Sequence, residues 1–293
     1  MSSTPILGGA ADAPAPLIKT DVNTLIQYAM LVKLAEGVGP GQTVYTPGTL
    51  INVTYGPVNV DYTAVTTFYG NDLATDKNPG RGNQIVSFGF VAQDAAGNVV
   101  IPVRGTEGIL EWVQDARFLA VKCPFLAGAG LTEDGFTAVY ESLRVAANSA
   151  AARLVDTLPT LKYPKPVTSL TICGHSLGGA LATLLALDVG ANTSLPHPTV
   201  YTYASPRTGD PSFADTYNQV VPNTCRVANR FDLVPKLPLP PQYEHVLGIF
   251  DLNPMLKVKT DLLCEHHLTT YLCLLSSLGG GAVLPLDTGC QGL

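Results

Sequence analysis

The stretch that decides the fold is Leu170-Thr-Ile-Cys-Gly-His-Ser-Leu-Gly-Gly179. It places Ser176 in the pattern G-x-S-x-G, after a β-rich run and before an apolar segment of helical character. In such a strand–turn–helix elbow the serine hydroxyl projects outward, and Gly174 and Gly178 are required because side chains there would clash with the backbone. The helix that follows directs its N-terminus at the serine and favours developing negative charge. The stretch therefore predicts a nucleophilic Ser176, with the Leu177 N–H as one oxyanion donor.

Strands and helices alternate around this elbow. On its C-terminal side we expect strands at 167–173, 199–204 and 224–231, with helices at 180–188 and 211–220. On its N-terminal side we expect a helix at 21–36, short strands within 43–68, a hairpin of 84–93 and 99–103, and one long helix at 133–155. This alternation predicts an α/β fold with a mostly parallel central sheet flanked by helices. We expect one domain, residues 19–293, after a mobile N-terminal arm, residues 1–18, that is rich in Ala and Pro.

Composition excludes several classes of protein. The chain has 293 residues, of which 46% are hydrophobic and only 14% charged, which argues against intrinsic disorder. A net charge of −6 argues against a nucleic-acid partner. His, Asp and Glu show no metal-ligand spacing, and no Gly-rich phosphate loop follows a strand, so we expect neither a metal nor a cofactor.

The cysteines and the apolar runs indicate in which compartment the chain resides and whether it crosses a membrane. The six cysteines include no CxxC pair, and their spacing is compatible with one bridge that involves Cys290. The first 16 residues lack Lys, Arg and a long apolar run, so they do not resemble a signal peptide. We expect a soluble cytoplasmic chain, or a secreted one whose leader has been removed. The uncharged run 268–286 contains Gly279, Gly280, Gly281 and Pro285, and so we expect no transmembrane segment.

A nucleophilic serine needs a base, and the base needs an orienting carboxylate. With this type of elbow the three residues follow the chain order Ser, Asp or Glu, His. Beyond the helix after Ser176, the candidate acids are Asp210, Asp215, Asp232, Asp251 and Asp261. Asp232 is favoured because it follows a strand and so lies at the carboxyl edge of the sheet, where sites of α/β proteins form. Asp210 and Asp215 fit a helix start.

The histidines leave two candidates for the base. His175 adjoins Ser176 and is predicted to pack beneath the elbow, while His197 lies between two prolines in an exposed loop. His245 is a rival base on an expected strand, although a buried structural role fits it better. His266 and His267 remain, late in the chain, and periodicity alone does not choose between them.

Together these motifs resemble the class 3 lipases, the fungal triacylglycerol lipase family of the α/β-hydrolase superfamily. The likeness extends from about Val22 to Leu275. It rests on seven marks: Val103-Arg-Gly-Thr106 with Trp112 and Asp115, Gly135-Phe136 with Tyr140, Gly174-His-Ser-Leu-Gly178, Tyr203-Ala-Ser-Pro-Arg207 with Gly209, Asn229-Arg-Phe-Asp-Leu-Val-Pro235 with Leu237-Pro238, Tyr243 with His245, and His266-His-Leu-Thr-Thr-Tyr271.

The resemblance implies a role for each site residue. It assigns Ser176 as the nucleophile, Asp232 as the acid and Thr106 as the second oxyanion donor. Many members read His-x-Leu-x-x-Tyr at the base, which matches His266, whereas members with His-Leu adjacent make His267 the alternative. No cofactor is implied.

The resemblance also implies an amphipathic lid after Thr106. Ile109, Trp112, Val113 and Ala116 recur with helical spacing, although an ordinary surface helix would show the same spacing. The implied activity is that of a serine carboxylic ester hydrolase, a triacylglycerol lipase that meets acylglycerols at a lipid–water interface. The alternatives are an esterase for soluble or aromatic (feruloyl-type) esters and a non-catalytic lipid-binding protein.

Overall fold

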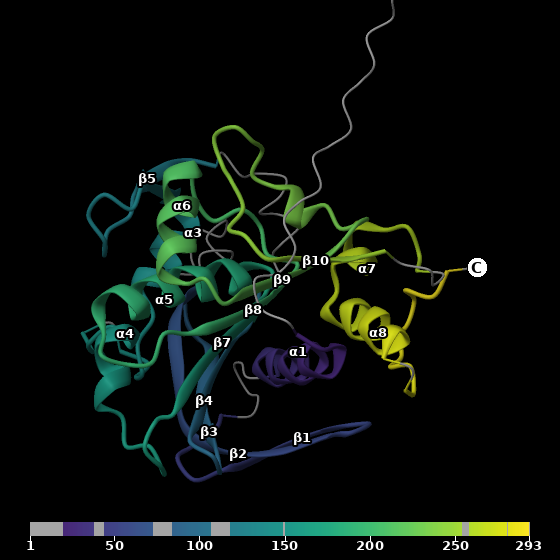
Figure 1. The fold of residues 1–293 in the computed structure, drawn as a ribbon, viewed down its shortest axis with the longest axis horizontal. Coiled ribbons are helices and arrows are strands. Elements are labelled where there is room, and N and C mark those ends of the chain that lie inside the picture. Colours follow the sequence, from purple (N-terminus) through teal and green to yellow (C-terminus); the bar gives the residue numbers. More distant parts are fainter. Residues whose placement is uncertain are drawn as a thin grey trace, which may run out of the picture.

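The computed structural model describes residues 20–37, 44–72, 84–106, 118–148, 150–253, 258–279 and 281–292. Within these residues the main sheet has eight strands in the order β1-β2-β3-β4-β7-β8-β9-β10 (Figure 1). Their bounds are β1 Leu50–Tyr55, β2 Val58–Asp72, β3 Gln84–Asp94, β4 Asn98–Val103, β7 Ser169–His175, β8 Thr199–Tyr203, β9 Thr224–Asn229 and β10 Ile249–Leu252. The strands from β4 to β10 run parallel, and β1 to β4 are antiparallel. The predicted α/β architecture is therefore confirmed, with an antiparallel extension at one side.

Helices cover both faces of this sheet (Figure 1). One face packs against α1 (Val22–Glu36) and α8 (Leu268–Leu278), and the other against α3 (Asp134–Glu141), α5 (Leu177–Asn192) and α6 (Pro211–Val220). The shorter elements are α4 (Leu154–Thr157), η2 (Leu158–Thr160), η3 (Val234–Lys236), α7 (Leu262–His266) and a two-stranded sheet of β5 (Ala120–Lys122) and β6 (Leu131–Glu133). The predicted arm, residues 1–18, lies outside the described residues.

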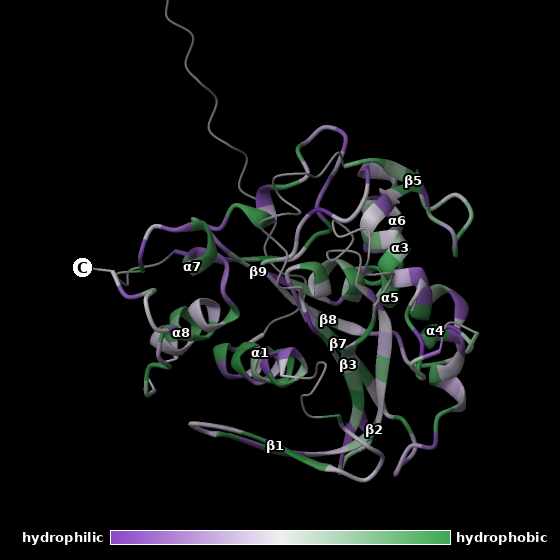
Figure 2. Ribbon diagram, turned by 180° about the vertical axis from the view of Figure 1, so that it is seen from behind, coloured by the Kyte–Doolittle hydropathy of each residue, from purple (hydrophilic) through white to green (hydrophobic). Residues whose placement is uncertain are grey.

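Side-chain alternation explains the two layers. On β4, Val99, Ile101 and Val103 belong to the cluster beneath α5, whereas Val100 belongs to the cluster beneath α1 and α8. Successive side chains of a strand point to opposite faces, so a strand buried on both faces is apolar throughout. Figure 2 shows hydrophobic stretches along β3, whereas β8 is paler and less hydrophobic.

The prediction of one long helix over residues 133–155 is wrong. α3 ends at Glu141, and Ser142 Oγ donates a hydrogen bond to Val139 O at 2.6 Å. Arg144 then pairs its backbone with Tyr69 of β2, through N–H···O bonds of 2.7 and 2.8 Å. Five of the apolar positions that suggested a helix are buried in one core cluster, namely Phe136, Val139, Tyr140, Leu143 and Leu154. Ala147 and Ala150, which fit the same spacing, are exposed. The spacing therefore predicted burial correctly only at the two ends of the segment, and a non-local pairing to the sheet interrupts the helix between them.

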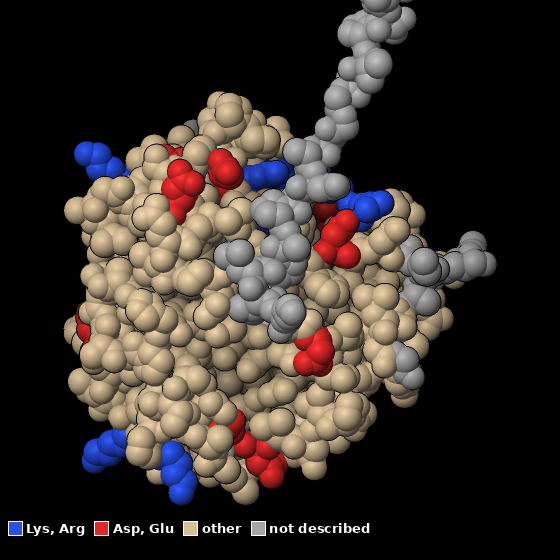
Figure 3. Space-filling model, in the orientation of Figure 1, with Lys and Arg blue, Asp and Glu red and all other residues tan. Residues whose placement is uncertain are grey.

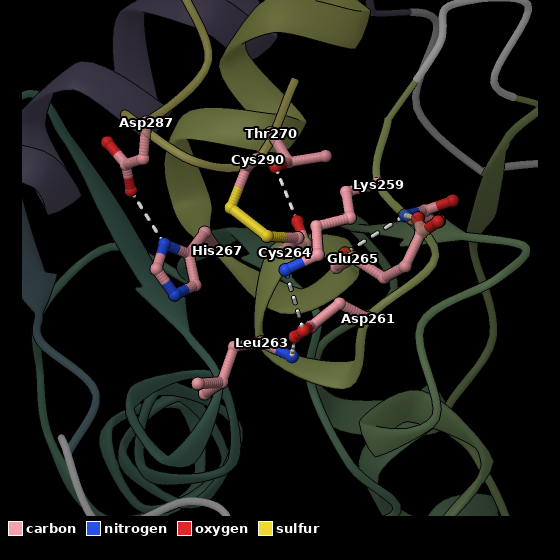
Figure 4. Close-up of a disulfide and its surroundings, with 10 residues drawn as sticks. Lys259, Asp261, Leu263, Cys264, Glu265, His267, Thr270, Asp287 and Cys290 are labelled. Atoms are coloured by element: carbon pink, nitrogen blue, oxygen red, sulfur yellow. Dashed lines mark hydrogen bonds and ion pairs between the residues drawn. A yellow bond between two sulfur atoms is a disulfide. The ribbon is translucent and has the colours of Figure 1, made fainter. Parts of the chain in front are cut away.

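A disulfide between Cys264 and Cys290 joins α7 to the C-terminal segment (Figure 4). The other four cysteines are buried and free. Charged side chains occupy little of the face drawn in Figure 3, as expected from the low charge content. In the described ranges, no helix has both the length and the apolarity needed to span a bilayer.

Candidate active site

The site begins at the junction of β7 and α5. β7 ends at His175 and α5 begins at Leu177, so Ser176 alone forms the turn, with φ 57° and ψ −127°. This sparsely populated conformation costs a non-glycine residue about 1–3 kcal/mol and is typical of functional sites. A Cβ on Gly174 would lie 2.1 Å from Gly178 O, and one on Gly178 would lie 2.3 Å from Val103 O. The two glycines therefore allow β4, β7 and α5 to meet closely behind the serine.

His266 and Asp232 complete a line of hydrogen bonds from Ser176. The Nε2 atom of His266 lies 2.9 Å from Ser176 Oγ, and its Nδ1 atom lies 2.8 Å from Asp232 Oδ2. Three separate elements contribute these residues: the elbow, the end of α7 and the loop after β9. All three are buried, and Asp232 is completely so. Such a line can remove the hydroxyl proton while it keeps the imidazole in one orientation.

Asp232 accepts hydrogen bonds from more than the histidine. Tyr271 Oη donates to Asp232 Oδ2 at 2.8 Å, and the Val234 N–H donates to Oδ1 at 2.9 Å. Tyr271 Oη also accepts a bond from the Asn229 N–H at 3.0 Å. A buried carboxylate is stable only when its oxygens are satisfied in this way. The loop and α8 thus hold the carboxylate in one position against His266.

The two adjacent histidines diverge. His266 is buried against Ser176, whereas His267 is more than a third exposed and pairs through Nδ1 with Asp287 Oδ2 at 2.6 Å (Figure 4). Leu268 and Tyr271 are both buried, which matches an inward-facing His-x-Leu-x-x-Tyr pattern. Of the two candidates, only His266 contacts the serine in the structure.

Burial sets the protonation of His266. Desolvation lowers the pKa of its imidazole below the ordinary value, and the contact with Asp232 opposes that shift without cancelling it. Near neutral pH the ring is therefore uncharged. Nδ1 then carries the proton that faces Asp232, and Nε2 is free to accept the proton of Ser176.

His175 has a more specific position than the packing role expected for it. Its Nε2 atom lies 2.8 Å from the backbone oxygen of His266, and its Nδ1 atom lies 3.2 Å from Glu36 Oε1 at the end of α1. Its ring is 4.9 Å from that of His266, centroid to centroid. The sequence shows His175 beside the serine, but Glu36 at the end of α1 precedes it by 139 residues, and no local pattern indicates their contact.

The remaining histidines lie outside this line. His197 is exposed, as expected. His245 lies before β10 rather than on a strand, and its Nε2 atom hydrogen-bonds to Pro235 O at 2.6 Å. Asp210 accepts a bond from Phe213 N and caps α6, while Asp251 is exposed and pairs with Arg230. None of these residues contacts Ser176.

Thr106 and Gly105 follow β4 and lie beside the elbow. A Cβ on Gly105 would approach Ser176 Cβ to 3.2 Å, so the backbone here runs close to the serine. Thr106, His266 and His175 also line one pocket of about 280 Å³ next to the triad. The Leu177 N–H belongs to the first turn of α5, where N–H groups have no acceptor within the helix. The predicted lid residues, Ile109, Trp112 and Val113, lie outside the described residues.

Comparison with known proteins points to one family. Residues 100–242, which are just under half of the chain and include the elbow and Asp232, match the family model described as lipase (class 3). This region is similar to the class 3 lipases.

Named relatives of this chain include a secreted lipase and a phospholipase. The chain is 35% identical to the secreted mono- and diacylglycerol lipase 1 of Fusarium solani, over 51% of this chain and 42% of the relative. It is 34% identical to the phospholipase A1-II 4 of Oryza sativa subsp. japonica, over 48% of this chain and 40% of that protein. The chain thus spans less than half the length of these curated relatives.

The solved structures support the fold. The crystal structure of the Lip2 lipase from Yarrowia lipolytica superposes with a TM-score of 0.61, covering 96% of this chain and 99% of that one at 20% identity. At such identity the likeness supports the arrangement of strands and helices in this chain, and not its substrate.

Some contributors to the site were not predicted as such. Tyr271 entered the sequence analysis only as part of a pattern, and its contact with Asp232 was not expected. Asn229 and Glu265 were not predicted to bond, yet Asn229 Nδ2 donates to Glu265 Oε2 at 2.8 Å and ties β9 to α7. Within the described residues, no cluster of three or more His, Cys, Asp or Glu is arranged to hold a metal ion.

Proposed function

We propose that this chain is a serine carboxylic ester hydrolase that acts on acylglycerols. The observation that carries the proposal is the hydrogen-bonded line from Ser176 through His266 to Asp232, placed on a strained elbow. The similarity of residues 100–242 to the class 3 lipase model supports ester bonds as the target. We further propose that residues 19–293 act as one domain, with the triad drawn from its C-terminal half.

The proposed reaction starts with proton transfer. Ser176 Oγ attacks the ester carbonyl carbon while His266 Nε2 takes the hydroxyl proton, over the 2.9 Å that now separates the two atoms. Asp232 keeps Nδ1 protonated and stabilises the imidazolium that forms. His266 then gives its proton to the leaving alcohol, and the acyl group remains on Ser176.

The tetrahedral intermediate needs donors for its negative oxygen. We assign the Leu177 N–H at the start of α5 and Thr106 beside the elbow to this role. Each such donor is worth about 3 kcal/mol of barrier. His266 then takes a proton from a water molecule, whose oxygen attacks the acyl carbon. The bond to Ser176 Oγ breaks, His266 returns the proton to Oγ, and the carboxylic acid is released.

For the substrate class, the named relatives supply the support. Mono- and diacylglycerol lipases and phospholipases A1 are both similar to this chain, and both names refer to esters of glycerol. We propose acylglycerols presented at a lipid–water interface as substrates, with Ile109, Trp112 and Val113 in a lid that covers the site in water. The proposed lid contains Trp112, the only tryptophan of the chain.

One set of assays tests the substrate class. We expect hydrolysis of p-nitrophenyl esters of rising chain length, and a steep rise in rate when emulsified triglyceride replaces a monomeric ester. A folded enzyme that cleaves short or aromatic soluble esters with no response to an interface would instead be an esterase. Absence of hydrolysis of every ester would support a lipid-binding protein and contradict the proposal.

A further inference from the structure

A second pocket, of about 500 Å³, lies apart from the triad at the β9–β10 side of the sheet. Arg226, in the middle of β9, lines it together with Arg207, which follows β8. The segment before β10 supplies much of its remaining wall: Pro240, Pro241, Tyr243, Val246, Leu247 and Ile249. The pocket therefore combines two guanidinium groups with a largely apolar wall.

Arg226 is a buried charge without a carboxylate. Arg226 is only 7% exposed, and its Nε–H donates a hydrogen bond to Val246 O at 2.7 Å. Among the described residues, no Asp or Glu pairs with Arg226, and its two Nη groups have no hydrogen-bond partner. Burial lowers the pKa of this guanidinium to about 10, so it stays charged near neutral pH. A charge held in this way is costly unless an anion reaches it.

A second cation increases that cost. Arg207 uses Nη1 to donate to the backbone oxygens of Lys236 and Pro238, and its charge lowers the pKa of Arg226 further. His245 also lines the pocket, but burial beside the two arginines lowers its pKa well below the ordinary value, so its ring is neutral. Among the described lining residues the only carboxylate is that of Glu244, and Glu244 is exposed.

We propose that this pocket binds the carboxylate of an amphiphile, with the head group on the guanidinium groups of Arg226 and Arg207 and the hydrocarbon chain along the apolar wall. Guanidinium groups pair well with carboxylates because their parallel N–H donors match the two oxygens. The apolar wall, especially Leu247 and Ile249, favours an anion with a tail over a small inorganic ion. A fatty-acid anion has this chemistry.

The inference stands independently of the proposed function, because binding requires no turnover. The pocket is nevertheless connected to the loop that carries Asp232. His245 bonds to Pro235 O, and Arg207 bonds to the next carbonyls along the same loop, at Lys236, Leu237 and Pro238. An anion that pulls on Arg207 therefore acts on the segment directly after the proposed acid.

Titration calorimetry with dodecanoate below its micelle concentration tests the proposal on the full chain. Dodecanol, which has the same tail without the charge, and inorganic phosphate, which has charge without a tail, are the matched ligands. Arg226→Met removes the buried charge, and Arg207→Gln removes the second one. Arg230→Met is the control variant, because Arg230 is exposed and pairs with Asp251.

A further variant avoids dependence on Arg226→Met folding. Ile249 lies directly opposite Arg226 in the parallel pairing of β9 and β10 and lines the pocket, so Ile249→Glu brings a permanent carboxylate next to Arg226. This substitution should block dodecanoate while it leaves both arginines in place.

We expect dodecanoate binding to weaken at least tenfold in Arg226→Met and in Ile249→Glu, less in Arg207→Gln, and not at all in Arg230→Met. Dodecanol and phosphate should each bind the wild-type pocket at least tenfold more weakly than dodecanoate. Unchanged dodecanoate binding in folded Arg226→Met or Ile249→Glu would overturn the site. Equal binding of dodecanol would overturn carboxylate recognition, and equal binding of phosphate would overturn the role of the tail.

Discussion

Asp232 and Arg226 are both buried charged residues, one just after β9 and one within it, yet their surroundings differ. Asp232 accepts hydrogen bonds from an imidazole, a tyrosine hydroxyl and a backbone N–H. Among the described residues the side chain of Arg226 donates one bond, to a backbone carbonyl, and another cation lies beside it. A buried charge whose contacts are complete holds its neighbours in position. One whose contacts are incomplete has the free donors that a ligand needs.

The largest effect is expected at the base. His266→Ala should lower kcat/KM by a factor on the order of 10⁵ to 10⁶, because the nucleophile loses its proton acceptor. His267→Ala should cost less than about tenfold, or 1.4 kcal/mol, since that side chain pairs with Asp287 at the surface. Measuring kcat/KM of both variants on the same soluble ester tests this ranking. The reverse ranking would move the base to His267.

The next largest effect is expected at the acid. Asp232→Asn keeps the shape of the side chain but loses the charge that fixes the imidazole tautomer, a change worth up to about 10⁴ in kcat. Asp251→Asn is the matched control, because Asp251 is exposed and bonds only to Arg230 among the described residues. If Asp251→Asn gave the greater loss in kcat, Asp251 and not Asp232 would be the catalytic acid.

Stability should separate Asp232 from Arg226 most clearly. Asp232→Ala leaves buried donors of His266, Tyr271 and Val234 without an acceptor, so the free energy of unfolding should fall by about 3 kcal/mol or more. Arg226→Met ends the burial of an unpaired charge, which offsets the lost bond to Val246 O. We expect a change of less than about 1.5 kcal/mol. Urea unfolding of both variants decides this, and an Arg226→Met loss as large as that of Asp232→Ala would show that Arg226 is fully satisfied.

A smaller effect is expected in the pH profile. Burial lowers the folded-state pKa of His266, so the acid limb of kcat/KM should have its midpoint below 6.5. The same shift favours the unfolded state in acid: the contribution of His266 to stability is present above pH 6.5 and is lost as the pH falls toward the folded pKa. Rates from pH 4 to 8 test the first point. A midpoint above 6.5 would mean that Asp232 outweighs burial.

Much of the fold follows from local sequence. The run from β7 into α5 is apolar and ends at a glycine-flanked serine, and the helix at α6 begins with an Asp cap and a proline. These signals lie within a few residues of the elements they predict. The position of Asp232 follows from one further rule, that the residue after a parallel strand lies at the active edge of the sheet.

Features that depend on distant contacts did not follow from the sequence. The segment 133–155 has helical spacing, but the pairing of Arg144 with Tyr69 interrupts it. The choice between His266 and His267 depends on which neighbour faces Ser176 and which faces Asp287. That Arg226 lacks a carboxylate partner can be seen only in the folded structure, because the residues around it come from β10 and the segment before it, which are distant in the sequence.

The most direct test of the central claim is covalent trapping of the nucleophile. The full chain is treated with an alkyl fluorophosphonate at neutral pH, and the site of labelling is located by peptide mass spectrometry. We predict one phosphonylated residue, Ser176, labelled rapidly in the wild-type chain and in His267→Ala, and lost in folded Ser176→Ala together with ester hydrolysis. Labelling at another residue, or a folded Ser176→Ala variant that keeps more than a few per cent of the activity, would contradict the account.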